Sequence, residues 1–156
     1  MIDQSIFRYV LGHFASGVTV VTARVDDTLH GITVSSFCSL SLDPPLVLIC
    51  INQFVRTHEL LPQAGSFAVN ILAENGESIS RHFASRIEDK FATVAYHTGV
   101  TGAPLLDAAL ATIECRLHSQ LPGGDHSIFV GEVVAAHARD DADPLLYYRG
   151  GYRRLH

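Results

Sequence analysis

The chain has 156 residues, of which 47% are hydrophobic and 17% are charged, and its formal net charge is −5. A chain near this length hides about two-thirds of its unfolded surface on folding, so we expect one globular domain over residues 1–156. The acidic balance and the lack of a basic run exclude nucleic acid as the main ligand, because binding a phosphate backbone requires clustered positive charge. No signal peptide is visible, and the longest strongly apolar run, residues 46–51, is too short for a membrane span. We therefore expect a soluble cytoplasmic protein that does not bind a membrane.

The cysteines and histidines do not form a recognisable metal or disulfide pattern. Cys38, Cys50 and Cys115 form no C-x-x-C pair and lie in apolar stretches, which predicts reduced, buried thiols. Nine histidines are present, but none belongs to an H-E-x-x-H motif. Cys115 and His118 are three apart on a predicted strand, which points them to opposite faces. We expect no metal site.

In chain order, the first predicted element is a helix that starts after Asp3, a favourable N-cap residue, and stops at Gly17. Its apolar residues recur at i, i+3, i+4 and i+7, which is the spacing of one helix face. This apolar stripe consists of Phe7, Val10, Leu11 and Phe14.

Strands dominate the remainder of the chain. Apolar and β-branched runs bounded by turn residues predict strands over residues 18–25, 31–42, 46–51, 67–72, 111–118, 128–138 and 145–148. Two further helices are expected, a brief one over residues 58–61 that Thr57 caps and Pro62 ends, and one over residues 74–91. Residues 97–107 and 120–127 are expected to be loops. Because strands and helices do not alternate as βαβ units, this order predicts a mainly β fold, a closed antiparallel barrel with peripheral helices.

The predicted strand over residues 31–42 carries an unusual number of hydroxyl groups. Side chains on a strand alternate between two faces. One face is mostly apolar and is expected to meet a core: Ile32, Val34, Ser36, Cys38, Leu40 and Leu42. The other face places four hydroxyls around one aromatic ring: Thr33, Ser35, Phe37, Ser39 and Ser41. This hydroxyl face either meets water, as Ser and Thr on solvent-facing strands ordinarily do, or holds a flat polar ligand.

Three neighbouring features favour the ligand. Phe37 can stack on a flat molecule. Arg56-Thr57 stand at a predicted helix start, where the helix dipole and free backbone N–H groups attract an anion that an arginine can grip with two hydrogen bonds. A second basic cluster follows at Arg81, Arg86 and Lys90, although a solvated helix face is the better explanation for that cluster taken by itself. Together these features describe a site for a phosphate-bearing aromatic ligand.

Sequence motifs of the common nucleotide-binding folds are absent. No G-x-G-x-x-G follows a strand, and no G-x-x-x-x-G-K-[ST] is present, which argues against a Rossmann fold and a P-loop. The G-x-S-x-G elbow of α/β-hydrolases is absent as well. A nucleotide would therefore be bound by other means.

Six sequence blocks, in this order, resemble the flavin reductase family, the reductase components of two-component flavin-dependent monooxygenases. The blocks are GVTVVT (17–22), GITVSSFCSLSLDPPLV (31–47), FAVNIL (67–72), GAPLLDAALATIEC (102–115), GGDHSIFVGEV (123–133) and PLLYYRGGY (144–152). The resemblance implies a split β-barrel that forms a homodimer with the flavin near the subunit interface. It also implies hydride transfer from NADH or NADPH to FMN or FAD, with the reduced flavin supplied to a partner monooxygenase.

The resemblance also assigns site residues. It implies flavin contacts at Thr33, Val34, Ser35, Ser36, Phe37, Ser39 and Leu40, and phosphate contacts at Val55, Arg56, Thr57 and Arg86. The nicotinamide nucleotide is implied to lie against Gly124, Asp125, Tyr148, Arg149, Gly150 and Gly151, with His126 beside the nicotinamide as the catalytic residue. Such an enzyme needs no side-chain nucleophile, because the cofactor carries the difficult chemistry and the protein orients the two rings.

Other interpretations remain open from the residues alone. Gly123 and Gly124 can simply turn a hairpin whose rim carries Asp125 and His126, and Tyr152 can be an edge-strand packing residue. Asn70 is expected to satisfy backbone groups inside the sheet. At the level of function, the alternatives are a flavin oxidase or haem-handling split barrel and a non-catalytic flavin-binding module. The sequence does not separate FMN from FAD or NADH from NADPH.

Overall fold

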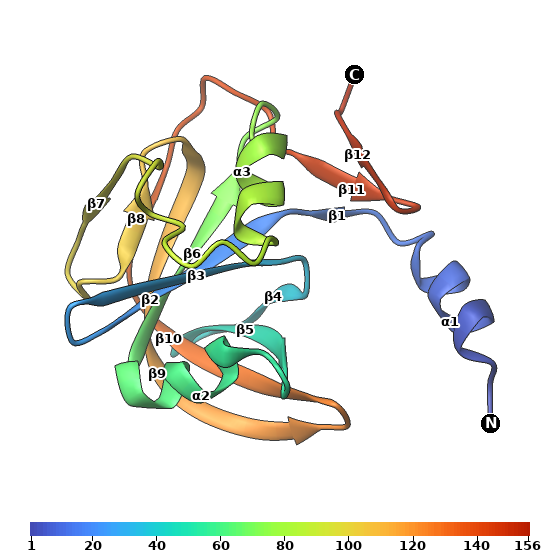
Figure 1. Cartoon of the computed structure of the whole chain (residues 1–156), viewed down its shortest axis with the longest axis horizontal. Helices are drawn as coiled ribbons and strands as arrows, with labels where there is room; N and C mark the ends of the chain where they lie inside the picture. The colour runs from blue at the N-terminus through green and yellow to red at the C-terminus, as the bar shows by residue number, and fades with distance from the viewer.

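The computed structural model describes residues 1–156 and contains three helices and twelve strands (Figure 1). In chain order the elements are α1 (Gln4–Leu11), β1 (Ser16–Gly17), β2 (Thr19–Val25), β3 (Thr28–Val34), β4 (Phe37–Leu42), β5 (Pro45–Asn52), α2 (Arg56–Ala64), β6 (Ser66–Leu72), α3 (Glu77–Phe83), β7 (Tyr96–Thr98), β8 (Pro104–Leu106), β9 (Ala109–Gly123), β10 (His126–Ala138), β11 (Leu146–Tyr148) and β12 (Gly151–Arg153). The mainly β fold predicted from the sequence is confirmed.

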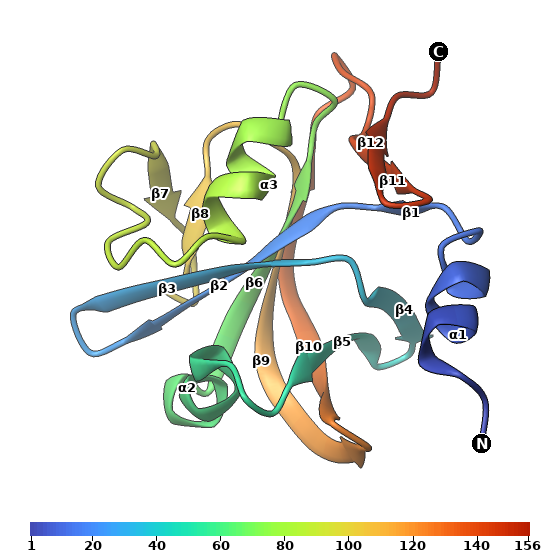
Figure 2. The same cartoon turned by 45° about the vertical axis from the view of Figure 1, so that its right-hand side comes forward.

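One seven-stranded antiparallel sheet forms the body, with the strand order β3-β2-β6-β9-β10-β5-β4. Its edge strands, β3 and β4, follow each other in the chain and are joined only by Ser35 and Ser36, without pairing with each other. The barrel is therefore split at this point rather than closed, which corrects the expectation of a closed barrel. Figure 2 shows the chain passing from β3 across this opening into β4.

The strand predicted over residues 31–42 is thus two strands. The alternation of side chains between two faces, which the prediction extends over the whole stretch, does not continue through the break. Val34 is buried as expected, but Leu40 and Leu42 lie on the edge strand β4 and are exposed, Leu42 to 96%. Phe37, which strand alternation places on the hydroxyl face, packs against the core of the barrel. The bend at Ser35–Ser36 therefore exchanges the two faces, since on β4 Phe37 packs inward while Leu40 and Leu42 are exposed.

Two hydrophobic clusters hold the fold together. The larger fills the barrel and includes Ile49, Phe67 and Phe129, all fully buried. The second lies between the sheet and α3 and is centred on Phe83. Buried Asn70 donates from Nδ2 to the carbonyl of Val20 (3.0 Å) and accepts from the amide of Leu106 (2.8 Å). Its predicted role inside the sheet is confirmed.

Several element boundaries differ from the prediction. Pro62 lies inside α2 instead of ending it, and the helix ends at Gly65, whose φ is 70°. Helix α3 covers only residues 77–83 of the predicted 74–91. The expected loop over residues 97–107 contains the paired strands β7 and β8. Strands β9 and β10 run up to a turn of two residues, 124 and 125.

Helix α1 is amphipathic but does not pack against its own barrel. Asp3 caps it by accepting from the amides of Ser5 (2.8 Å) and Ile6 (3.2 Å), as predicted. None of its residues is buried, and Phe14, just beyond it, is 84% exposed. The helix lies at the side of the molecule in Figure 1. No helix of the chain combines the length and hydrophobicity that crossing a membrane requires.

All three cysteines are free thiols, but they differ in exposure. Cys115 is fully buried, and burial raises its pKa to about 12. Cys50 is half-buried, and burial, with a smaller contribution from Cys38, raises its pKa. The expectation of three buried thiols is wrong for Cys38, because it lies on the exposed edge strand β4.

Candidate functional site

The segment with the hydroxyl side chains borders two cavities, one at each end. Residues 29–32 of β3 line a cavity of about 480 Å³ that α2 and the residues after α3 complete, which we call the α2–α3 cavity. Residues 35–38 line a cavity of about 710 Å³ beneath α1, which we call the α1–β4 cavity. One stretch of chain, with the bend at Ser35–Ser36 in it, therefore borders both cavities.

Not every hydroxyl of this segment is free to bind a ligand. The Thr33 hydroxyl donates to the carbonyl of Ser80 (2.6 Å) and so ties β3 to α3. The Ser36 hydroxyl donates to the carbonyl of Cys50 (2.9 Å), which supports the bend. Ser35 lines the α1–β4 cavity and makes no side-chain hydrogen bond within the protein. Of the hydroxyls at positions 33, 35 and 36, only that of Ser35 is therefore free to bind a ligand.

The remaining predicted flavin contacts divide into two groups. Phe37 lines the α1–β4 cavity and rests on the barrel core, so its position is fixed. Val34 is buried in that core, and only its backbone can face a ligand. Ser39 and Leu40 are exposed on β4 and line neither cavity. The structure therefore does not bring Ser39 and Leu40 together with the other predicted flavin contacts.

The α2–α3 cavity contains the predicted phosphate contacts. Val55, Arg56 and Thr57 line one side, and Arg86 lines the other. Neither arginine forms a salt bridge within the chain, so both guanidinium groups are available to an anion. The N-cap position of α2 is occupied by Val55, which cannot cap the helix with its side chain. The first amides of α2 are thus open to a ligand at the positive end of the helix dipole.

Two groups that the sequence did not assign add to the electrostatics of this cavity. Burial lowers the pKa of His30, and the charge of Arg56 lowers it further, so His30 favours the neutral state. Burial also lowers the pKa of Lys90, whose ammonium donates to the carbonyls of Phe83 (2.8 Å) and Gly31 (3.1 Å). Lys90 therefore fastens the residues after α3 to β3 and shapes the cavity that Arg86 lines.

Close contact between backbone and side chains also shapes the floor of this cavity. A Cβ atom at Gly31 would lie 2.6 Å and 2.7 Å from two ring carbons of Phe83. Phe83 is fully buried and cannot move aside. The absence of a side chain at Gly31 therefore allows β3 to pack closely against α3, and it leaves the space of the cavity above this contact open.

The predicted catalytic residue stands at the tip of the β9–β10 hairpin. Gly124, with a φ of 71°, and Asp125 form the turn, so the simple hairpin interpretation describes the backbone correctly. Nδ1 of His126 donates to Oδ1 of Asp125 (2.7 Å), and this hydrogen bond holds the pKa of the Asp125 carboxyl below its ordinary value. The bond orients the imidazole and leaves Nε2 free at the surface.

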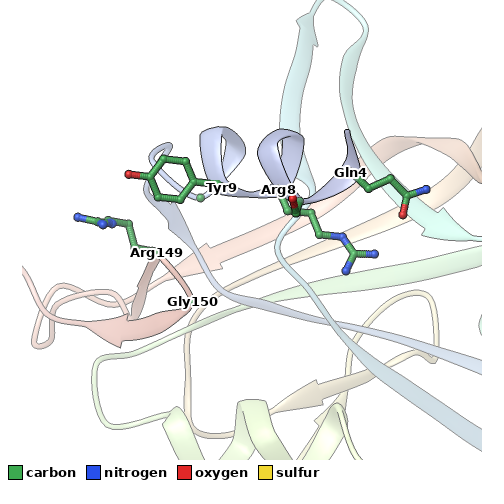
Figure 3. A pocket seen from close by; sticks show the side chains of 7 residues that line it. Gln4, Arg8, Tyr9, Arg149 and Gly150 are labelled. Carbon is green, nitrogen blue, oxygen red and sulfur yellow. The ribbon is translucent and has the colours of Figure 1, made fainter. Parts of the chain in front are cut away.

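The tail residues form a second tight hairpin beside α1. Arg149 (φ 50°) and Gly150 (φ 75°) make its turn, and the Arg149 amide donates to the carbonyl of Gly12 (2.9 Å). Both residues line a cavity of about 660 Å³ together with Arg8 and Tyr9 of α1 (Figure 3). In Figure 3 the guanidinium groups of Arg8 and Arg149 point in different directions. Tyr148 and Gly151 flank the turn.

Tyr152 has a structural role, in agreement with the packing interpretation. Its hydroxyl forms a hydrogen bond of 2.7 Å with the Ser80 hydroxyl, and the Arg81 guanidinium lies 5.0 Å from the centre of its ring. These contacts join the tail hairpin to α3.

The two halves of the predicted nicotinamide site lie apart within one chain. Figures 1 and 2 both place the β9–β10 turn at the bottom of the molecule and the β11–β12 hairpin at its upper right. One subunit therefore does not assemble the site that the sequence blocks suggested.

The fold is a split β-barrel with two cavities, of which the α2–α3 cavity is lined by two unpaired arginines and the α1–β4 cavity mainly by apolar residues. The family model described as "Flavin reductase like domain" matches residues 11–156. The reductase component of 4-nitrophenol 4-monooxygenase/4-nitrocatechol 2-monooxygenase from Rhodococcus opacus is 48% identical over 151 residues, which are 97% of this chain and 80% of that protein. The reductase component of 4-hydroxyphenylacetate 3-monooxygenase from Thermus thermophilus is 42% identical, over 97% of each chain.

A solved structure agrees with these relatives. The NADH:FAD oxidoreductase SgcE6 of Streptomyces globisporus C-1027, in complex with NAD and FAD fragments, superposes with a TM-score of 0.94 and 41% sequence identity over 99% of this chain and 93% of that one. This chain belongs to the flavin reductase family. The family predicted from the sequence blocks is confirmed, and so are the split barrel and the enzyme class.

Proposed function

We propose that this protein transfers a hydride from NADH to a flavin and that the residues bordering the two cavities hold the flavin. The observation that carries the proposal is the segment 29–38, which lines the cationic α2–α3 cavity at one end and the apolar α1–β4 cavity at the other. A flavin has a matching shape, with a flat ring system at one end and a phosphate at the other. When bound, the flavin supplies the hydride acceptor and NADH the donor.

The residues of the chain bind and orient the two molecules. Arg56 and the free amides at the start of α2 hold the phosphate nearest the ribityl chain, while Arg86 stands across the cavity. Ser35 and the backbone of residues 33–37 offer hydrogen-bond partners to the ring, and Phe37 limits its position. Backbone N–H groups that donate to the ring would also favour the negative charge that develops on reduction.

His126 positions the nicotinamide. The hydrogen bond with Asp125 fixes the imidazole, so Nε2 is presented in a constant direction. Nε2 can bond the carboxamide of the nicotinamide and thereby orient the ring face toward the flavin. Holding the reacting atoms about 3–3.5 Å apart supplies much of the rate acceleration without a proton-transfer group.

The protein is proposed to act as a homodimer. Helix α1 exposes its apolar stripe, and the β11–β12 hairpin lies beside it. The α1–β4 cavity is also open, so a second copy can cover both the apolar stripe and this cavity. A two-fold arrangement would also allow the tail hairpin of one copy to approach the β9–β10 turn of the other, which one chain alone does not achieve.

The partner and the compartment are also part of this proposal. The relatives named reductase components act with a monooxygenase, and we propose that this protein likewise supplies reduced flavin to such a partner. Three free thiols support a cytoplasmic location. Either FMN or FAD satisfies the phosphate contacts described.

Anaerobic stopped-flow measurement of flavin bleaching tests the proposal. Wild-type protein mixed with NADH and either FMN or FAD should bleach the flavin, and His126→Ala should slow this step while the flavin dissociation constant stays unchanged. Binding of flavin without bleaching would instead establish a non-catalytic flavin-binding module. An unaltered rate in His126→Ala would remove His126 from the site.

A further inference from the structure

The loop between β5 and α2 is fastened to the β9–β10 turn by one residue, Gln53, through its side chain and its backbone N–H. Its amide Nε2 donates to the carbonyls of Gly124 (3.2 Å) and His126 (3.4 Å), and its backbone N–H donates to the carbonyl of Asp125 (2.9 Å). Three consecutive carbonyls of the turn therefore accept from one residue. The pairing of Asn52 with His126 lies directly beside these contacts.

A second connection joins the same two segments from α2. Nε2 of His58 and the hydroxyl of Ser127 form a hydrogen bond of 2.7 Å, and Ser127 is buried. The His58 ring also packs edge-on against Phe129, with ring centres 5.4 Å apart. Because Phe129 is fully buried in the barrel core, His58 is anchored as well as hydrogen-bonded.

The residues that make the two connections, Gln53 and His58, stand on either side of the proposed phosphate contacts along the chain. Arg56 and Thr57 lie between Gln53 and His58 in the sequence. His126 supplies one of the carbonyls that Gln53 binds, and it directly precedes Ser127, whose hydroxyl His58 binds. The proposed phosphate site and the proposed nicotinamide residue therefore belong to one cross-linked unit. Side chains of either segment cannot shift without stretching these hydrogen bonds.

We propose that Gln53 and His58 are positioning residues that hold His126 in register with Arg56 and Thr57, so that a bound flavin and a bound nicotinamide nucleotide are aligned by the same rigid unit. This inference rests on the proposed function, because it gives His126 and Arg56 the roles assigned there. Neither Gln53 nor His58 touches the reacting atoms; both act through the β9–β10 turn. A misplacement near 1 Å can cost about 10²-fold in rate, so even partial loosening of the turn is measurable.

The test uses His58→Phe, which keeps the edge-on ring packing but removes the hydrogen bond, together with Gln53→Ala. His58→Gln serves as the rescue variant, because an amide N–H can still bond the Ser127 hydroxyl. Matched controls are Gln63→Ala, which removes an amide that donates within α2 (3.3 Å), and His118→Phe, which removes the His118–Ser119 contact (3.3 Å).

We expect His58→Phe and Gln53→Ala each to lower the rate of flavin bleaching by NADH by about 10-fold, with the flavin dissociation constant unchanged and both controls at the wild-type rate. His58→Gln should recover most of the loss. In a His126→Ala background neither substitution should lower the rate further, because both act through His126. Amide hydrogen exchange over residues 124–128 should be faster in both variants than in the controls.

The inference would be overturned if His58→Phe and Gln53→Ala both bleached the flavin at the wild-type rate. It would also be overturned if their losses of rate added to the loss caused by His126→Ala. An equal loss of flavin affinity would overturn it too, because that result indicates general damage to α2. If wild-type protein does not bleach the flavin at all, the proposed function fails, and the hydrogen-exchange comparison still decides whether Gln53 and His58 tether the turn.

Discussion

Replacing Phe14 by serine should convert the proposed dimer into monomers without unfolding the barrel. Phe14 is 84% exposed in the single chain, so nearly its whole side chain is available to a second copy. Burying a phenylalanine side chain contributes about 1.5–3 kcal/mol, and a two-fold interface counts each position twice, which gives about 3–6 kcal/mol in total. The dimer dissociation constant should therefore rise by about 10²-fold to 10⁴-fold.

Sedimentation velocity over a range of protein concentrations measures this change. The control is Val100→Ser, because Val100 is also apolar and 71% exposed but lies beside β7, away from α1. Both variants should keep the wild-type midpoint of urea unfolding when measured as monomers. A wild-type protein that remains monomeric at all concentrations, or a Phe14→Ser variant that associates as tightly as Val100→Ser, would refute the reasoning.

Three further predictions concern the site and the core. Arg56→Ala should weaken flavin binding by about 1.5–3 kcal/mol, the contribution of a charged hydrogen bond, whereas Arg24→Ala on β2 should not; a fluorescence titration with the wild-type affinity in both would contradict the phosphate role. Gly31→Ala should lower the free energy of unfolding by about 1–3 kcal/mol, because its Cβ would overlap a buried aromatic ring, whereas Gly17→Ala has open space; equal urea midpoints would count against this packing. Since burial raises the pKa of Cys115 from the ordinary 9.0 to about 12, the unfolded thiol loses its proton first, and the stability that this group contributes should fall as the pH rises from 9.0 to about 12. Urea unfolding of wild type and Cys115→Ala across that range should show the difference shrinking; a constant difference would contradict the assignment.

The strands of the barrel could be predicted because their residues carry a local signal. The β-branched run of β2 and the apolar run of β5 favour extended structure, and turn residues mark their ends. The break at Ser35–Ser36 has no such signal, since neither glycine nor proline is present there. It is imposed by pairing at a distance, because β3 must join β2 at one edge and β4 must join β5 at the other.

The candidate site was predictable residue by residue but not as an assembly. Arg56 and Arg86 both line the α2–α3 cavity, as the resemblance to the family implied for the phosphate contacts. The distance between the β9–β10 turn and the tail hairpin depends on the whole barrel, which spacing along the chain does not encode. Contacts such as Gln53 with the β9–β10 turn join residues about seventy positions apart, and nothing in the local sequence marks them.

The orientation of α1 illustrates a related difficulty. The spacing of its apolar residues correctly predicts an amphipathic helix, but it does not tell which surface receives the apolar face. In the single chain no surface covers the apolar face of α1, so this face is available to a surface of a second copy.

The most direct measurement is the primary isotope effect on flavin bleaching, recorded in anaerobic single-turnover stopped-flow with NADH deuterated at the transferred C4 position. Direct hydride transfer between a nicotinamide and a flavin oriented by this protein predicts bleaching that is slower with the deuterated nucleotide and that depends on His126. Bleaching that is absent with wild-type protein, or a rate no greater than that of free flavin with NADH in buffer, would contradict the account.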